Sequence, residues 1–280
     1  MAARRAVNAG MRALQIFTAI PKYYGDKVSI KTERVDRFRD ALASTAISLE
    51  HVVVHAAYVL NTATPDSEKW GRARDVLAKE FERSTRLGVG AVCFHPGAAT
   101  DNDRKAAAQR IAAAMVHALE QVNGNTRLLV ENTAGAGTTM GRTPEEMGGI
   151  LQHIPAHLRA RTGYGLDTCH LFASGYDLRE SQAAVTNILD AFEAATGTAP
   201  GFFHLNDSEG ALASNKDRHR LIGDGAIGEQ AFAWLLADSR TNRVPLILET
   251  PQLNVEIAAD DESPDPYDVR MIELLQRLTS

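Results

Sequence analysis

Cysteine is rare in this sequence, and long apolar runs are absent from it. The 280 residues include two cysteines, Cys93 and Cys169, which form neither a disulfide framework nor a Cys-x-x-Cys pair. No apolar run reaches the roughly 18 residues of a transmembrane helix, and the N-terminal residues are too polar for the apolar part of a secretory signal. We therefore expect a cytoplasmic protein without a membrane span, and we take it to be a monomer.

Positively charged residues are also fewer than negatively charged ones. The chain has 30 lysine and arginine residues against 35 aspartate and glutamate residues, which gives a formal net charge of −5. This balance disfavours a generally basic nucleic-acid-binding surface, although it is compatible with a local positive site. The apolar content of 44% supports a substantial core, and no linker or low-complexity segment interrupts the chain. We expect one domain spanning residues 1–280.

Segments typical of strands and of helices alternate along the whole chain, which indicates an α/β fold with a parallel sheet. Seven strands are expected to begin near residues 13, 51, 89, 127, 163, 200 and 245. Helices are expected at about 3–10, 33–48, 67–87, 103–122, 180–196 and 227–238, with two more opening at Thr143 and near the C-terminus. The usual spacing of about 38 residues is typical of one βα unit of a TIM (β/α)8 barrel.

The chain opens on a helix, where a complete barrel of eight units would open on a strand. We therefore expect a TIM (β/α)8 barrel that lacks its first β-strand. The strands at 13–18 and 245–249 would then be unpaired edges. A longer chain that supplies the eighth strand should be more stable, because it would pair both edges.

Histidine and carboxylate side chains occupy the ends of six of the seven expected strands. These residues are His55, His95, Glu131, Asp167, His204 and Glu249. In a parallel barrel all strand ends of this kind lie at one mouth, so the six side chains should converge. A single histidine at a strand end is usually an ordinary loop residue, but six strand ends of seven behaving alike are not explained in that way.

Three further candidates, His170, Asp217 and His219, are expected in the loops above that mouth. The nine residues together offer five imidazoles and four carboxylates and no thiolate. They are too many for one tetrahedral zinc ion, but they suffice for two or three ions if a carboxylate bridges. The other histidines, His51, His117, His153 and His157, are interpreted as surface or packing residues.

One glycine motif suggests a different kind of site. The segment Gly223-Asp-Gly225-Ala-Ile-Gly228 matches a dinucleotide-binding fingerprint. However, the segment 215–219 before it is too polar for a buried parallel strand, and only 57 residues lie beyond Gly223. We therefore reject a dinucleotide site.

Seven short motifs resemble those of endonuclease IV, the zinc-dependent apurinic/apyrimidinic endonuclease, over essentially the whole chain. They are His55-Ala-Ala-Tyr58, Phe94-His-Pro-Gly97, Glu131-Asn-Thr-Ala-Gly, Asp167-Thr-Cys-His170, His204-Leu-Asn-Asp-Ser, Asp217-Arg-His219 and Ile247-Leu-Glu249-Thr-Pro. The resemblance implies a (β/α)8 barrel with three Zn²⁺ ions, one of which Mn²⁺ could replace. It also implies that double-stranded DNA containing abasic sites is the partner.

The resemblance assigns a role to each ligand. The first ion would be held by His55, His95 and Glu131, the second by Glu131, Asp167, His204 and Glu249, and the third by His170, Asp217 and His219. Glu131 would be the catalytic bridging carboxylate. Water activated by two of the ions would attack phosphorus. Cleavage 5′ to the abasic site would leave a 3′-hydroxyl and a 5′-deoxyribose phosphate.

The resemblance also indicates DNA contacts and one departure from the family. Tyr58 and Val59 match positions that enter the minor groove, with valine where leucine is common, and Lys22 lies where an arginine usually inserts. Lysine cannot reproduce the planar stacking of arginine. The family begins with a strand and a Gly-Gly loop, and Met1 aligns just after those glycines.

Two alternatives stay open on the sequence alone. A metal-dependent sugar isomerase or epimerase of the xylose-isomerase-like barrels would use a similar set at the strand ends, but it would not need Asp217-Arg-His219 as a third site. A truncated relative that binds damaged DNA without cutting it would fit the missing strand. Metal content and cleavage of an abasic duplex separate these readings.

Overall fold

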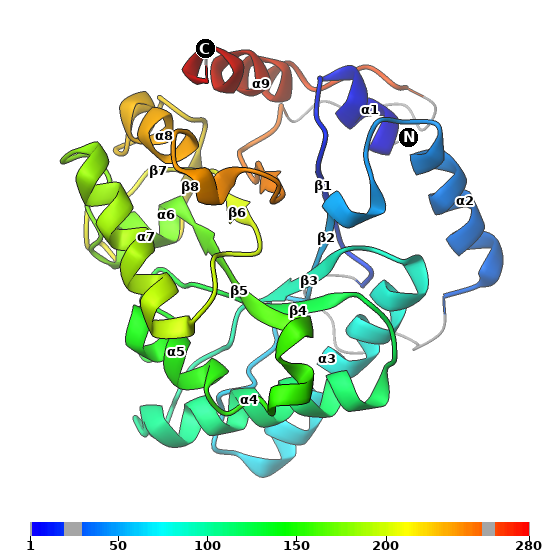
Figure 1. Cartoon of the computed structure of the whole chain (residues 1–280), viewed down its shortest axis with the longest axis vertical. Coiled ribbons are helices and arrows are strands. Elements are labelled where there is room, and N and C mark those ends of the chain that lie inside the picture. Colours follow the sequence, from blue (N-terminus) through cyan, green and yellow to red (C-terminus); the bar gives the residue numbers. More distant parts are fainter. Residues whose placement is uncertain (1, 20–29, 254–260, 280) are drawn as a thin grey trace.

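The computed structural model describes residues 2–19, 30–253 and 261–279. Seven parallel strands form one curved sheet in the order β1-β2-β3-β4-β5-β6-β9 (Figure 1). Their bounds are β1 Leu14–Ile16, β2 Val52–His55, β3 Ala91–Phe94, β4 Arg127–Glu131, β5 Thr162–Asp167, β6 Phe203–His204 and β9 Leu246–Ile247. The seven predicted strands are confirmed, in chain order and neighbour by neighbour.

Helices surround this sheet on its outer side, as Figure 1 shows. Their bounds are α1 Ala2–Asn8, α2 Thr32–Ala43, α3 Ser67–Leu87, α4 Arg104–Gln121, α5 Pro144–Leu151, α6 Thr168–Ser174, α7 Gln182–Thr196, α8 Glu229–Leu236 and α9 Pro266–Leu278. Short 3-10 helices occupy Leu49–His51, Ala156–Arg161 and Ser239–Thr241. The fold is a TIM barrel, as predicted. In the part of the chain that the structure describes, no helix has the length and apolarity needed to cross a membrane.

The long helix α3 shows why its ends could be read from the sequence. Asp66 accepts hydrogen bonds from the backbone N–H groups of Glu68 and Lys69, at 3.1 and 3.0 Å, and so satisfies two donors that the helix leaves free. Gly88 ends the helix with φ of 82°, a conformation that glycine adopts without strain. The boundaries therefore match the expected range of 67–87.

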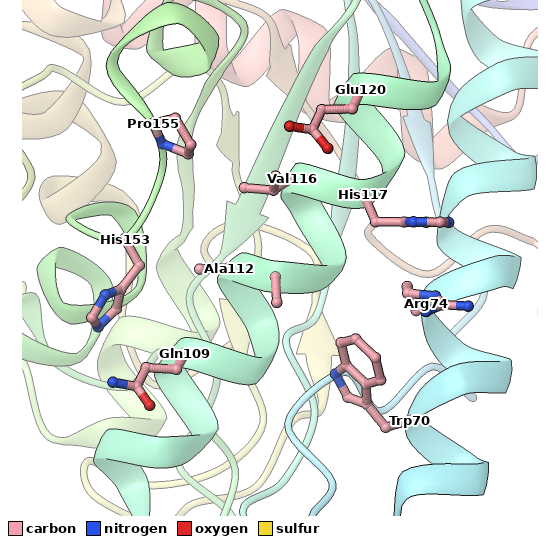
Figure 2. Close-up of a pocket in the computed structure, with 10 residues that line it drawn as sticks. Trp70, Arg74, Gln109, Ala112, Val116, His117, Glu120, His153 and Pro155 are labelled. Carbon is pink, nitrogen blue, oxygen red and sulfur yellow. The ribbon is translucent and has the colours of Figure 1, made fainter.

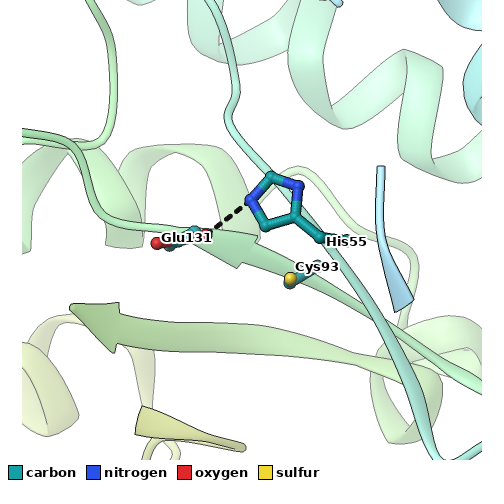
Figure 3. A group of neighbouring side chains, drawn as sticks. All are labelled: His55, Cys93 and Glu131. Atoms are coloured by element: carbon teal, nitrogen blue, oxygen red, sulfur yellow. Dashed lines mark ion pairs between the residues drawn. The ribbon is translucent and has the colours of Figure 1, made fainter. Parts of the chain in front are cut away.

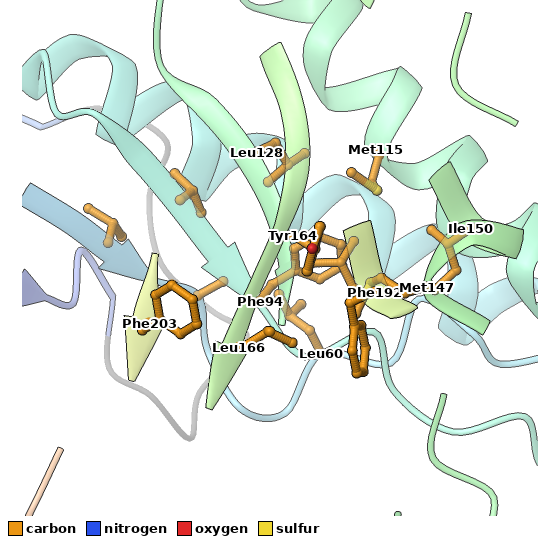
Figure 4. Close-up of a cluster of buried hydrophobic side chains, with 14 of the residues drawn as sticks. Leu60, Phe94, Met115, Leu128, Met147, Ile150, Tyr164, Leu166, Phe192 and Phe203 are labelled. Carbon is orange, nitrogen blue, oxygen red and sulfur yellow. The ribbon is translucent and has the colours of Figure 1, made fainter. Parts of the chain in front are cut away.

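The apolar core lies between the strands and the helices. Leu128 of β4, Phe94 of β3 and Met115 of α4 contribute to it, and Phe192 of α7 stacks on Tyr164 with ring centroids 6.1 Å apart (Figure 4). A second, smaller cluster fills the inside of the barrel. It consists of Val53, Ala91, Cys93, Leu129 and Phe202. Because strand residues alternate between faces, the residues two positions beyond this inner layer also point inward, into the mouth of the barrel.

β1 and β9 are the two ends of the sheet, as expected, and no ladder between them is formed among the described residues. A cavity of about 290 Å³ lies there, with Leu14 and Ile247 of the two strands and Ile272 of α9 in its wall. The barrel is therefore nearly closed rather than closed. Among the described residues, the side chains of Gln15 and Glu249 form a hydrogen bond across this gap.

A small antiparallel pair was not predicted. It joins β7 (Asp207–Ser208) to β8 (His219–Arg220) above the mouth of the barrel. The buried carboxylate of Asp207 accepts hydrogen bonds from Gly223 N, Gly225 N, Ile227 N and Gly228 N, at 2.8 to 3.2 Å. The glycine motif therefore surrounds the buried carboxylate of Asp207. Its N–H groups are already used, which agrees with the rejection of a dinucleotide site.

Candidate metal centre

Six residues singled out in the sequence meet at the mouth of the barrel. Each is the last residue of its strand or lies one or two residues beyond it: His55, His95, Glu131, Asp167, His204 and Glu249. Strand register explains the convergence, because Asp167 pairs with His204 across β5 and β6, and Glu131 pairs with Gly165 across β4 and β5. The structure therefore brings together the side chains that the strand pattern placed at one mouth.

Glu131 is at the centre of this group and is fully buried. One carboxylate oxygen, Oε2, lies 3.3 Å from His55 Nε2 and 3.4 Å from His95 Nε2. The other, Oε1, lies 2.8 Å from His204 Nδ1 and 3.4 Å from His170 Nδ1. A single carboxylate thus faces two separate sets of imidazoles. This is the position that a bridging ligand requires.

The nine candidate ligands fall into compact groups. Within a group, one ligand atom of each residue lies within 4.8 Å of the others. Among the described residues these groups include Glu131 with Asp167, His204 and Glu249; His170 with Asp217 and His219; and His95 with Glu131 and His170. His55 joins Glu131 in a further group with Cys93. All nine residues belong to at least one group.

The third group is built differently from the sequence expectation. His170 was expected in a loop but lies in the first turn of α6, which begins directly after β5. Asp167 caps this helix, because its Oδ1 accepts a hydrogen bond from His170 N at 3.0 Å. Its other oxygen, Oδ2, lies 3.7 Å from Nε2 of His219, which is in β8 rather than in a loop. The prediction of a loop was wrong for both histidines, because α6 begins directly after β5 and β8 forms by pairing with β7.

Asp217 completes the third group and opens it to solvent. Its carboxylate lies 3.2 Å from His170 Nε2 and 2.9 Å from His219 Nε2, and its side chain is 46% exposed. The other eight candidate ligands are more buried. The third group is therefore the part of the cluster that is most open to solvent on its Asp217 side.

Backbone carbonyls hold three of the imidazoles in place. His55 Nδ1 lies 2.6 Å from Ala56 O, His170 Nδ1 lies 2.9 Å from Asn132 O, and His219 Nδ1 lies 3.3 Å from Glu249 O. The Nε2 atom of each ring is thereby directed toward the carboxylates. Such partners for the second nitrogen are usual for histidines that bind metal ions.

Two asparagines that sequence reasoning missed support Asp167. Asn132 Oδ1 accepts a hydrogen bond from Asp167 N at 2.6 Å, and Asn206 Nδ2 donates one to Asp167 Oδ2 at 2.6 Å. Asn206 Oδ1 also accepts from Glu249 N at 3.0 Å. Both asparagines are fully buried. A signal was present, because each lies inside a quoted motif, directly after Glu131 or two residues after His204.

Both cysteines lie against the cluster. Figure 3 shows Cys93 beside His55 and Glu131, and Cys169 groups with Asp167 and His219. Burial raises the pKa of each thiol to about 12. Both thiols are therefore protonated near neutral pH in the metal-free protein.

Several donor atoms of this cluster lack hydrogen-bond partners among the described residues, which fits a site for divalent cations. Glu131 Oε2, His170 Nε2 and His219 Nε2 are buried, and none of them makes a hydrogen bond of acceptable geometry. Yet each lies 2.9 to 3.4 Å from a group of complementary charge. Buried polar atoms normally find hydrogen-bond partners. Atoms that approach one another without such a bond point into a shared space, as the ligands of an ion do.

Comparisons with known proteins agree with this geometry. A protein-family model described as a xylose isomerase-like TIM barrel matches residues 3–273. A protein named probable endonuclease 4 from Chloroflexus aurantiacus is 37% identical over 249 residues, which cover 89% of this chain and 86% of the relative. Another of that name, from Halothermothrix orenii, is 34% identical over 274 residues, which cover 98% and 93%. The chain belongs to the endonuclease IV family.

Comparison with solved structures distinguishes a member of this family from proteins that share only its fold. Endonuclease IV from Thermus thermophilus matches with a TM-score of 0.79 and 29% identity, covering 99% of this chain and 93% of that one. A D-tagatose 3-epimerase-like protein matches with a TM-score of 0.69 and 16% identity, covering 96% and 88%. The second likeness shows the barrel alone, because one fold hosts many chemistries.

Tyr58 and Val59 are the candidate DNA contacts that the structure describes, and they lie beside candidate metal ligands. Tyr58 is 48% exposed, and its ring lies 4.7 Å from that of His55 and 5.6 Å from that of Phe17. Val59 is half-buried, and both residues line a cavity of about 360 Å³ that reaches His95. Lys22 lies outside the described residues.

A larger cavity of about 570 Å³ lies elsewhere, on the outer wall of the barrel (Figure 2). Trp70 and Arg74 of α3 face His117 of α4 across it, and His153 lies at its far side. None of the candidate ligands takes part in its lining. His117 and His153 therefore remain outer-surface residues, as the sequence indicated.

Electrostatics at the mouth favours charged side chains. Burial opposes ionisation of Glu131, but His204 and His95 outweigh it and hold its pKa well below the ordinary range. Burial likewise opposes charge on His170 and His219. Asp167 and Asp217 prevail and raise the pKa of His170 to about 10 and that of His219 to about 9.

These pKa shifts predict proton release when metal ions bind. At about pH 7.5 both His170 and His219 hold a proton in the metal-free protein, since their pKa values lie above that pH. A ligand nitrogen must lose its proton, so saturation with Zn²⁺ should release at least two protons per chain. Affinity should rise as the pH is raised from 6.5 toward 10. Calorimetry in buffers of different ionisation enthalpy measures the release, and a value near zero would contradict the shifts.

Proposed function

We propose that this member of the endonuclease IV family is a DNA repair nuclease. It hydrolyses the phosphodiester bond 5′ to an abasic site and leaves a 3′-hydroxyl and a 5′-deoxyribose phosphate. The observation that carries the proposal is Glu131, a buried carboxylate whose two oxygens each face two imidazoles. Relatives named probable endonuclease 4 that match most of the chain support the reaction class.

The same nine side chains would hold three Zn²⁺ ions, with Mn²⁺ able to replace one. The first ion would be held by His55, His95 and Glu131, the second by Glu131, Asp167, His204 and Glu249, and the third by His170, Asp217 and His219. When bound, the ions would supply positive charge for the phosphate and lower the pKa of water so that it becomes a nucleophile near neutral pH. Nitrogen and oxygen donors of this mixture suit zinc.

Bound ions would add positive charge to the mouth, counted here with neutral histidines. Four ligand carboxylates against three divalent ions leave the site at +2, since six positive charges meet four negative ones. The formal charge of the whole chain moves by the same six units, from −5 to +1. A cationic mouth on an otherwise acidic protein can bind a phosphate backbone.

Tyr58 and Val59 are positioned to recognise the damage. The phenol of Tyr58 projects beside the ligands His55 and His95, with ring centroids 4.7 and 6.0 Å away. Partial burial, together with the carboxylates of Glu249 and Glu131, raises its pKa, so the ring stays neutral. A neutral aromatic side chain can fill the space left by a missing base without repelling the backbone.

A sugar isomerase on the same barrel is the competing reading, but the likeness to a D-tagatose 3-epimerase-like protein shows a shared fold and not a shared reaction. Such an enzyme would not need the third group of His170, Asp217 and His219. The identity of 34–37% to proteins named probable endonuclease 4 also favours the nuclease.

The direct test is nicking of a duplex that contains one tetrahydrofuran abasic analogue. The zinc-loaded protein should nick it, and a chelator should stop the reaction. Glu131→Gln should abolish nicking while leaving much of the DNA affinity, because a neutral amide cannot bridge two ions. Glu120→Gln, the same change at an exposed position of α4, is the matched control and should nick normally.

A Glu131→Gln protein that keeps more than about a tenth of the wild-type rate would contradict the bridging role. That threshold corresponds to about 1.4 kcal/mol of activation free energy. A folded, zinc-loaded wild type that never nicks the duplex would instead favour a DNA-damage binder or a sugar isomerase.

Tyr58→Ala should weaken selectivity for abasic over intact duplex more than it weakens binding to intact duplex. The expected loss is about 1–3 kcal/mol, the range typical of aromatic contacts with bases. Tyr58→Phe retains the ring and should retain selectivity. Fluorescence anisotropy with the two duplexes measures both affinities, and equal losses on both would make Tyr58 a packing residue.

A further inference from the structure

Gln15 is a polar residue in β1 that points into the barrel. It pairs in register with Val53 of β2, which belongs to the apolar cluster inside the barrel. Its strand neighbours Leu14 and Ile16 pack against the outer core instead. The alternation of the strand therefore carries the Gln15 amide toward the metal ligands, from the strand (dark blue in Figure 1) that forms one end of the sheet.

The amide contacts two of those ligands at once. Its Oε1 lies 2.7 Å from His204 Nε2, and its Nε2 donates a hydrogen bond to Glu249 Oε1. The thiol of Cys93 also approaches Oε1, at 3.9 Å. Gln15 thereby ties β1 to β6 and β9, across the place where the backbone ladder of the barrel is interrupted.

Chemistry fixes the direction of each of these bonds. An ionised carboxylate can only accept, so the Gln15 group beside Glu249 must be the NH₂. The carbonyl oxygen then faces His204, and it needs an N–H on His204 Nε2. With the proton there, the lone pair of the neutral ring is on Nδ1. That atom lies 2.8 Å from Glu131 Oε1 and 3.2 Å from Glu249 Oε2.

The ring nitrogen of His204 that faces away from the carboxylates contacts a side chain, whereas the corresponding nitrogen of three other histidines contacts a backbone carbonyl. His55, His170 and His219 each have a carbonyl oxygen of the chain beside Nδ1. Such oxygens are fixed by the fold, and no substitution removes them. In His204 the nitrogen turned away from the carboxylates is Nε2, and its partner is Gln15.

We propose that Gln15 is a positioning residue for the second metal site. It fixes the tautomer of His204 and the orientation of Glu249, so that both face the ion shared with Glu131 and Asp167. This inference rests on the metal site of the proposed function. It goes beyond that function by assigning a role to a residue outside the nine ligands.

The test is metal retention in Gln15→Leu, which keeps the size of the side chain but can neither accept nor donate. We expect a loss of about 10–100-fold in affinity for the most weakly held Zn²⁺, the usual effect of removing the partner of a ligating histidine. Ile16→Val, which trims the other face of the same strand, is the matched control and should keep wild-type affinity. Competition with a chromogenic chelator measures both, and thermal melts report folding.

A second measurement needs no variant. Imidazole ¹⁵N resonances of the zinc-loaded wild type should show His204 with Nε2 protonated and Nδ1 bound to metal. A wild type with Nδ1 protonated, or a folded Gln15→Leu protein with unchanged zinc affinity, would overturn the proposal. Neither readout uses DNA. If both measurements give the expected result but the protein does not nick a duplex, the proposed nuclease activity is contradicted and the role of Gln15 is not.

Discussion

The structure depends on a buried negative charge, the carboxylate of Glu131, which is wholly removed from water. An isolated carboxylate in such a place would cost several kcal/mol or would take up a proton. Here four imidazoles surround it, and His204, His95 and His55 hold its pKa low. The same neighbours explain why the position suits a bridging ligand: each oxygen already has its own pair of nitrogens.

The barrel makes this arrangement possible through strand alternation. Inward-facing residues of β2, β3 and β4, with Phe202 just before β6, form an apolar layer first, and candidate ligands follow two positions further along the chain. The lower layer excludes water and fixes the strand spacing. The upper layer can therefore hold charges at defined distances without a long loop. Asn132 and Asn206 then fix Asp167 by hydrogen bonds on three of its atoms.

Much of this could be predicted from the sequence, for physical reasons. The strands are short apolar runs separated by helices with clear caps, such as Asp66 and Gly88 around α3, so their positions follow from local chemistry. The ligands stand out because histidine and carboxylate end six strands alike. Gln15 could not be found in this way, since one amide in an apolar strand has no pattern of its own. Its role comes from register with β2 and from the meeting of β1 with His204 and Glu249, both of which are tertiary features.

The helix α6 was not predicted from the sequence, for a different reason. It has seven residues and begins directly after β5, so Asp167 serves both as a strand end and as a helix cap. The pair β7 and β8 has two residues in each strand, too few for any periodicity. Local signals of that length are ambiguous, and tertiary contacts decide them.

We propose above that nine side chains, joined through Glu131, form one site for three ions. The most direct measurement is the zinc content of the reconstituted, dialysed protein by mass spectrometry, with anomalous diffraction at the zinc edge to locate each ion. The account predicts three zinc ions per chain, with Glu131 between two of them. One ion per chain, or three ions of which none contacts Glu131, would contradict it.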